Sequence, residues 1–147
     1  MSTVSRTFTV APPPEIVIPY LADFAHAEQW DPGTESCVPI SDEPVAVGSK
    51  WRNTSKIAGI TTELTYTLER LNHEMVVLVG RNDTATSTET IEVIRDGDGS
   101  RVTYTNEVLF NGAAKLAAPL GKIVFEKLGN DTEKQLAATL DALQPQT

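Results

Sequence analysis

Glu89 is the residue best placed for acid–base chemistry, because the predicted pairing of its strand turns the carboxylate toward the interior. Residues 91–95 and 101–110 flank the turn sequence Asp-Gly-Asp-Gly, which predicts a hairpin with a four-residue loop. This register pairs Val93 with Val102, Ile91 with Tyr104 and Glu89 with Asn106. A buried carboxyl group is paired or protonated, so an inward Glu89 is a candidate general acid or base.

Two structural explanations compete with a chemical role for Glu89. A β-bulge turns the residue outward, or the carboxylate sits at the edge of a cavity and binds water or a nearby lysine. On general grounds these explanations are the commoner ones, because bulges often reset which way sheet residues face. The catalytic interpretation therefore depends on the actual register of the strand.

A second predicted hairpin supplies a face of mixed polarity. Residues 49–57 and 60–71 flank Ala58-Gly59, which predicts a two-residue turn that pairs Trp51 with Tyr66 and Asn53 with Leu64. The face that carries Trp51 then also carries Asn53, Ser55, Thr62, Leu64, Tyr66 and Leu68. Apolar walls with a few hydrogen-bonding groups are typical of ligand pockets, although satisfied core polar residues give the same pattern.

The only long span with helical periodicity is residues 113–143. Its apolar stripe consists of Leu116, Leu120, Val124 and Leu128 and continues through Phe125, Thr132, Leu136, Leu140 and Leu143. Burying this stripe requires the predicted strands between residues 48 and 110. Gly129 and Asn130 interrupt the pattern, and we favour one helix with a local bend over two short helices.

The remaining segments complete an α+β order of strand, two short helices, six strands and a long helix. The predicted elements are a strand at 5–10, a short helix at 15–24 containing Pro19, a further turn at 26–30, and strands at 34–41 and 75–80. The strand at 75–80 is apolar on both sides, so it lies centrally or contributes to a dimer surface. We expect one domain spanning residues 1–147.

Composition narrows the classes of partner. The net charge of −8, from 12 basic and 20 acidic residues, disfavours a nucleic-acid partner. A single cysteine, Cys37, and the lack of an apolar leader or spanning segment predict a cytoplasmic protein without stable membrane insertion. Two histidines far apart in sequence give no recognisable metal or haem spacing, so neither a metal nor another cofactor is expected.

The order of elements and several short motifs resemble the START, polyketide-cyclase and pollen-allergen (SRPBCC) superfamily over nearly the whole chain. The motifs are Pro13-Pro14-Glu15, Leu21-Ala22-Asp23-Phe24, Trp30-Asp31-Pro32, Val47-Gly48, Val102-Thr103-Tyr104 and Leu116-Ala117-Ala118-Pro119-Leu120. The resemblance implies a helix-grip fold, in which a curved seven-stranded antiparallel sheet wraps the C-terminal helix. It also implies a cavity between sheet and helix that holds an apolar small molecule.

Combining the predicted faces with this resemblance gives a candidate ligand site. Its residues are Trp51, Asn53, Ser55, Leu64, Tyr66, Leu78, Ile91, Tyr104, Asn106, Phe110, Leu116, Leu120 and Val124. Phe110 lies at the corner between the last strand and the helix, so it is expected to flank the cavity mouth together with the three helix residues of this set.

Three functions are compatible with these features. The first is binding or transport of a lipid, polyketide or steroid-like compound without changing it, since no transferable catalytic motif is present. The second is a cyclase, aromatase or dehydratase in which Glu89 is the acid or base and Tyr66, Tyr104 or Asn106 polarises oxygens. The third is a regulatory or interaction module, possible as a homodimer, whose cavity is filled by its own side chains.

Overall fold

A computed structural model describes residues 2–57, 59–111 and 118–143 of the chain. Its elements are β1 (Ser2–Val10), α1 (Pro14–Ala22), the 3-10 turn η1 (Phe24–His26), α2 (Ala27–Trp30), β2 (Thr34–Pro39), β3 (Lys50–Ile57), β4 (Ile60–Leu71), β5 (Met75–Arg81), β6 (Ala85–Asp96), β7 (Gly99–Phe110) and α3 (Ala118–Asp141).

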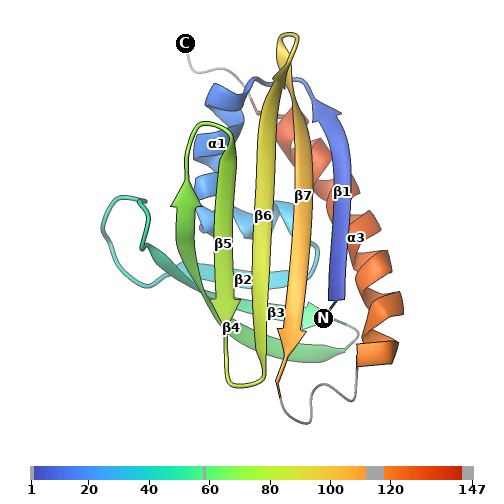
Figure 1. Ribbon diagram of the computed structural model, residues 1–147. Coiled ribbons are helices and arrows are strands. Elements are labelled where there is room, and N and C mark those ends of the chain that lie inside the picture. The colour runs from blue at the N-terminus through green and yellow to red at the C-terminus, as the bar shows by residue number, and fades with distance from the viewer. Residues whose placement is uncertain (1, 58, 112–117, 144–147) are drawn as a thin grey trace.

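The strands form one antiparallel seven-stranded sheet in the order β1-β7-β6-β5-β4-β3-β2. Every neighbour in space is also a neighbour in sequence except β1, which pairs with β7. Figure 1 shows the helices on one side of this sheet, with α3 running beside β1. The arrangement confirms the predicted helix-grip fold. Strand β5, which is apolar on both faces, lies at the centre of the sheet, one of the two positions predicted for it.

The predicted registers of both hairpins are confirmed. In the first hairpin Trp51 pairs with Tyr66, and in the second Glu89 pairs with Asn106. The predicted four-residue loop of the second hairpin is wrong, because Asp96 still pairs with Gly99 and leaves a two-residue turn. Gly97 supports this tighter turn with a φ of 61°, a left-handed conformation that glycine adopts without steric cost.

Helix α3 continues through Gly129, so the alternative of two short helices is wrong. The glycine lets the helix approach β1 closely, since a Cβ atom there would lie 2.4 Å from Cγ2 of Val4. Close approach of two backbones is a common reason for a glycine inside a helix. The segment proposed as a separate turn at the start of the helix, residues 113–117, lies outside the described residues.

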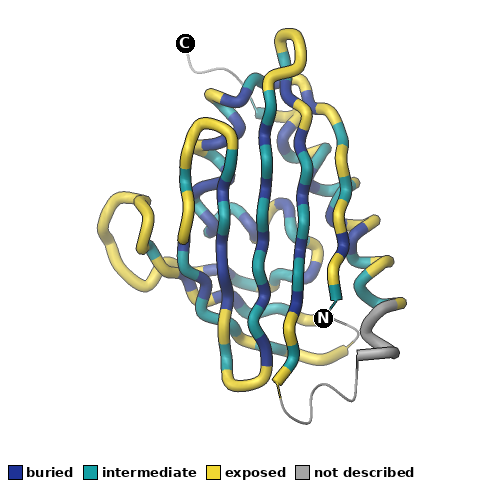
Figure 2. Tube along the Cα trace, viewed as in Figure 1, coloured by how far each residue is buried: buried dark blue, intermediate teal, exposed yellow. Residues whose placement is uncertain are grey.

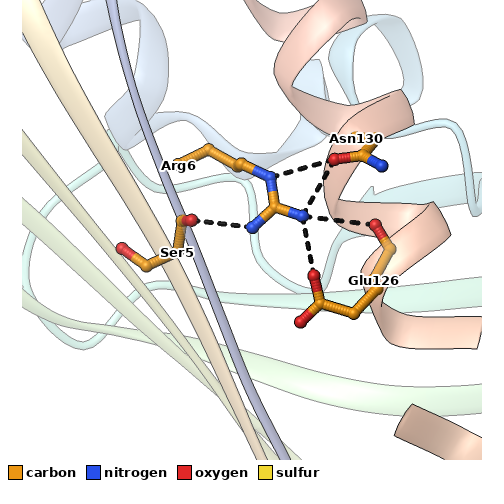
Figure 3. Close-up of polar contacts among 4 residues, drawn as sticks. All are labelled: Ser5, Arg6, Glu126 and Asn130. Atoms are coloured by element: carbon orange, nitrogen blue, oxygen red, sulfur yellow. Dashed lines mark hydrogen bonds and ion pairs between the residues drawn. The ribbon is translucent and has the colours of Figure 1, made fainter. Parts of the chain in front are cut away.

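An arginine on β1 fixes the helix next to this glycine (Figure 3). The guanidinium of Arg6 donates to Oδ1 of Asn130 from Nε at 3.1 Å and from Nη2 at 2.9 Å. Its Nη2 also pairs with the Glu126 carboxylate at 3.0 Å. The Arg6 side chain is 19% exposed and that of Glu126 is 54% exposed, so water screens the ion pair from the glutamate side. Asn130 therefore anchors the helix to the sheet instead of starting a new helix.

The far end of α3 is held by apolar burial and one cap-like contact. Leu136 and Leu140 are fully buried, and the backbone N–H of Ala11 donates to Oδ1 of Asp141 at 2.8 Å. The helix residues described just before Glu126 are less enclosed, since Ile123 is 76% exposed and Phe125 is partly buried. The helix is thus gripped most firmly from its middle to its C-terminal end.

We predict that Gly129→Ala destabilises the protein despite improving helix propensity. Overpacking against Val4 costs about 1–3 kcal/mol, whereas alanine returns about 1 kcal/mol of propensity. Urea unfolding of the two proteins measures the difference. The double variant Gly129→Ala with Val4→Ala is the matched control, because it removes the contacting methyl groups. A Gly129→Ala protein more stable than the natural one contradicts the close contact.

Candidate functional site

Glu89 lies inside the protein, as the hairpin register predicts. Burial alternates along β6 from Ala85 to Ile94 (Figure 2). Glu89 takes one of the buried positions and is 4% exposed. The strand pairs in unbroken register with β5 and β7, while a register shift occurs in β4 between Leu68 and Arg70. The explanation that a bulge turns Glu89 outward is therefore wrong.

Two buried tyrosines are the polar neighbours of the Glu89 carboxyl group. The hydroxyl of Tyr66 donates to Oε1 over 3.5 Å, a long hydrogen bond, and Oε2 has no partner among the described residues. Burial and the negative charge of Asp31 raise the pKa of Glu89 from 4.5 to about 8, against hydrogen bonding from Tyr104 and Tyr66. The group is therefore largely a neutral carboxylic acid at pH 7.

The tyrosine hydroxyl groups stay protonated over the same range. Burial, followed by the charge of Glu89, raises the pKa of Tyr66 and of Tyr104 well above 10. Gly80 makes room for the first of them, because a Cβ atom at this position would lie 2.6 Å from the Tyr66 ring. The site thus holds one carboxylic acid and two hydroxyl donors inside an apolar interior, an arrangement suited to binding or polarising an oxygen atom.

An aromatic cluster surrounds this polar group. Phe24 is fully buried, and its ring centroid lies 4.5 Å from that of Tyr66, 6.0 Å from Trp30 and 6.3 Å from Trp51. Trp30 in turn contacts Tyr104 edge-on at 6.0 Å. Nε1 of each tryptophan is buried without a partner in the described part of the chain. Side chains from η1 and α2 therefore fill the interior next to Glu89.

The other predicted polar residues are largely occupied by one another. The amide of Asn106 donates to Oγ of Ser87 at 2.9 Å. The amide of Asn53 donates to Oγ1 of Thr34 at 3.0 Å, and its carbonyl accepts from Ser55 at 2.6 Å. These contacts leave Asn53 and Asn106 as satisfied core polar residues, which was the alternative to a ligand-binding role.

The apolar residues of the candidate site divide into a closed floor and a partly open rim. Leu78 and Ile91 are fully buried beside Trp51, Tyr66 and Tyr104. The rim consists of the partly exposed inward residues Ser55, Leu64 and Phe110, with Val124 of α3 also partly exposed. Phe110 packs against Phe125 of the helix at 6.4 Å. Leu116 and the side chain of Leu120 lie outside the described residues, so their predicted role at the mouth is not tested.

Sequence reasoning missed the contribution of the segment between β1 and β2. Phe24 and Trp30 lie in two of the family motifs, but neither is among the predicted residues of the ligand site. Neither local periodicity nor strand register says which sheet residues a short turn covers. Gly80 was likewise missed, although a glycine inside a strand signals close approach by another group.

Two surface hollows are lined by described residues. One, of about 470 Å³, lies between α1, the β4–β5 turn and the end of β6. The other, of about 250 Å³, lies between η1 and the connection from β2 to β3, and reaches Trp51. The described histidine, cysteine and acidic residues form no group of three that could hold a metal ion. Within that same part of the chain, no helix is long and apolar enough to cross a membrane.

The sequence matches one known protein family over nearly its whole length. Residues 1–145 match the family described as polyketide cyclase/dehydrase and lipid transport. The chain belongs to this family. Its fold and its sheet order agree with that membership, while the range of activities in the description leaves the reaction and ligand open.

Solved structures similar to this family member share its fold. A START superfamily protein from Mycobacterium smegmatis has a TM-score of 0.79 and 17% identity, covering 98% of this chain and 100% of its own. The Zhui aromatase/cyclase from Streptomyces sp. R1128 has a TM-score of 0.72 and 14% identity, covering 94% and 90%. Ginseng major latex-like protein 151 from Panax ginseng has a TM-score of 0.68 and 10% identity, covering 95% and 97%. A search of curated proteins found no match.

We predict that the stability of the protein falls between about pH 5 and pH 8 because Glu89 must ionise. Its folded pKa of about 8 exceeds the ordinary 4.5, so the folded state retains a proton that the unfolded state releases. The free energy of unfolding falls by up to about 1.4 kcal/mol per pH unit, and the fall ends above the pKa that Glu89 has in the folded protein. Urea unfolding across this range measures it.

Glu89→Gln is the control for this pH dependence. It removes the ionisation while keeping the shape, so the fall should become shallower. Asp31, whose pKa burial also raises, is present in both proteins and cancels in the comparison. Equal slopes for the two proteins contradict a protonated Glu89.

Proposed function

We propose that this protein binds one mostly apolar small molecule with an oxygen-bearing polar group, between the sheet and α3. The observation that carries the proposal is Oε2 of the buried, neutral Glu89, which has no hydrogen-bond partner among the described residues. Buried polar atoms are nearly always hydrogen-bonded, so an orphan inside an apolar interior suits a site that a ligand completes.

The surrounding residues support an apolar ligand of limited size. Leu78 and Ile91 form an aliphatic floor, and Trp51 and Tyr66 add aromatic surface. The inward residue Leu64 is only partly buried, which leaves apolar surface for a ligand near the first half of α3. Such walls with few polar groups are characteristic of small-molecule sites.

A purely structural role explains Glu89 less well. Replacing a buried, poorly bonded polar group with an apolar one of similar shape is often neutral or stabilising. The buried carboxyl group therefore lowers the stability of the protein, and an apolar residue of similar shape would fill the same space without this cost. Perturbed carboxyl groups of this kind gather at functional sites, which supports a role for Glu89 in recognition.

Native mass spectrometry of the freshly purified protein, followed by organic extraction, tests the binding proposal. We expect a one-to-one adduct that organic solvent releases as an apolar compound. Adding this compound at a hundredfold excess over Kd should raise the Tm by roughly 5–10 °C, because it binds only the folded state. An unliganded mass and an unchanged Tm with candidate lipids contradict the proposal and favour the interaction module.

A matched pair of variants places the ligand on the inner face. Leu64→Trp fills the partly open rim and should abolish the adduct, whereas Thr65→Trp adds the same bulk to the opposite face of the sheet. Loss of binding in both variants points to general misfolding. If both variants still bind the ligand, the partly open rim is not part of the ligand site.

The same carboxyl group supports a second candidate, an acid–base enzyme of the cyclase or dehydratase type. A pKa of about 8 suits proton transfer near neutral pH, and two tyrosine hydroxyls stand ready to polarise a carbonyl group. The aromatase/cyclase among the similar structures shares the fold alone and does not decide the matter.

If the extracted compound or a carbonyl-bearing precursor is turned over, Glu89→Gln should lower kcat by about 100-fold or more, since proton transfer is lost. Binding should persist, because glutamine retains both the shape and a hydrogen-bond donor. Product formation followed by chromatography measures the effect. Unchanged turnover in Glu89→Gln removes the catalytic assignment and leaves the binding role.

A further inference from the structure

We propose that the ligand reaches the interior through the hollow beside η1, and that the Phe24 ring is the gate of this entrance. The inference rests on the proposed binding function and adds a route to it. The hollow of about 250 Å³ is lined by Asp23 and Ala25, the two chain neighbours of Phe24. Trp51, which contacts Phe24, is also among its lining residues.

Phe24 lies behind the wall of this hollow, because its ring packs against Trp51, which lines the hollow, and against Tyr66 on the inner side. The flanking residues of η1 face the hollow, while the Phe24 ring is fully buried against Tyr66 at 4.5 Å. The Tyr66 hydroxyl then reaches Glu89. The side chains of Phe24 and Tyr66 therefore lie in succession between the wall of the hollow and the Glu89 carboxyl group.

The polar atoms around Phe24 indicate that its place suits a different occupant. Trp30 and Trp51 both contact the Phe24 ring, and the indole N–H of each lacks a partner among the described residues. A phenyl ring offers neither group an acceptor. A ligand with carbonyl or hydroxyl oxygens, replacing the ring, offers acceptors to the indoles and a partner to Oε2 of Glu89.

The backbone that carries Phe24 is a short element suited to local movement. Turn η1 contains three residues between the short helices α1 and α2. The carboxylate of Asp23 accepts from the backbone N–H of Ala25 at 3.1 Å and caps the turn. Gates are commonly built on such segments, where few backbone bonds must change.

The opposite lip of the hollow is apolar at its surface. Val45 lines the hollow and is 40% exposed. Ile40 and Val47, on the same connection from β2 to β3, are 50% and 60% exposed. Figure 1 shows this connection as a loop projecting from the sheet on the side away from α3. An exposed apolar lip provides a first contact for an apolar molecule leaving water.

Stopped-flow fluorescence with 6-propionyl-2-(dimethylamino)naphthalene, a neutral and mostly apolar probe that carries one carbonyl oxygen, tests the route. Ser41 lines the hollow and is exposed, so Ser41→Cys modified with a bulky maleimide should obstruct this entrance. Ile123→Cys, modified in the same way, obstructs the first half of α3 instead. The natural Cys37 is 2% exposed and burial raises its pKa to about 12, so it does not compete for the reagent.

We expect the Ser41 adduct to slow probe association about tenfold or more, and the Ile123 adduct to leave it nearly unchanged. A matched pair of phenylalanine variants tests the gate itself. Phe24→Leu should speed association and dissociation together, whereas Phe125→Leu, beside the other possible mouth, should change neither.

Slowing by the Ile123 adduct but not by the Ser41 adduct overturns the proposed route and leaves the binding function intact. Rates unchanged in Phe24→Leu, in a protein that still binds the probe, overturn the gate. If neither the natural protein nor Phe24→Leu binds the probe at equilibrium, the inference fails, and the extraction experiment then decides the binding function separately.

Discussion

The Glu89 carboxyl group lies in an interior of aromatic and aliphatic side chains, and its burial constrains everything around it. An ionised carboxylate in such a place is very costly, so the group keeps its proton to about pH 8. Tyr66 and Tyr104 are hydroxyl donors at its side, and neither supplies a positive charge. The site is therefore a neutral hydrogen-bonding centre, which suits an uncharged oxygen better than an anion.

The grip of α3 on the sheet complements this interior. Gly129 lets the helix approach β1, and Arg6 then bonds to Asn130 and Glu126 from the adjoining turn. These contacts fix the middle of the helix, while Leu136 and Leu140 bury its C-terminal half. The described residues before Glu126 make no comparable contact, and Ile123 among them is largely exposed. Rigid support at one end and less enclosure at the other is a common arrangement around ligand sites.

The sequence predicted local relations better than distant ones. A short turn and a period of two determine which residues of a hairpin face each other, so Glu89 opposite Asn106 and Trp51 opposite Tyr66 followed from the chain itself. The loop between β6 and β7 was misjudged by two residues without harm, because extending both strands equally preserves the register.

Contacts between segments that are far apart in the chain left no pattern in the sequence comparable to that of the hairpins. Gly129 looked like a break in a helix, since its partner Val4 lies at the other end of the chain. The position of Phe24 among Trp30, Trp51 and Tyr66 depends on how η1 crosses the sheet, which no local pattern encodes. Asn53 and Asn106 were expected at a ligand, and their bonds to Thr34 and Ser87 show how neighbouring strands satisfy such groups internally.

The Phe24 ring fills a part of the interior that a ligand could occupy in its place. A core optimised for stability alone pairs its polar atoms. Here two indole N–H groups and one carboxyl oxygen have no partner among the described residues, while a phenyl ring lies among their side chains. The ring supplies apolar contact and excludes water, but it provides no acceptor. Replacing it with a molecule of similar shape and added oxygens exchanges one set of apolar contacts for another and gains hydrogen bonds. In the proposed complex these polar atoms therefore favour a ligand that carries oxygens over a pure hydrocarbon of the same shape.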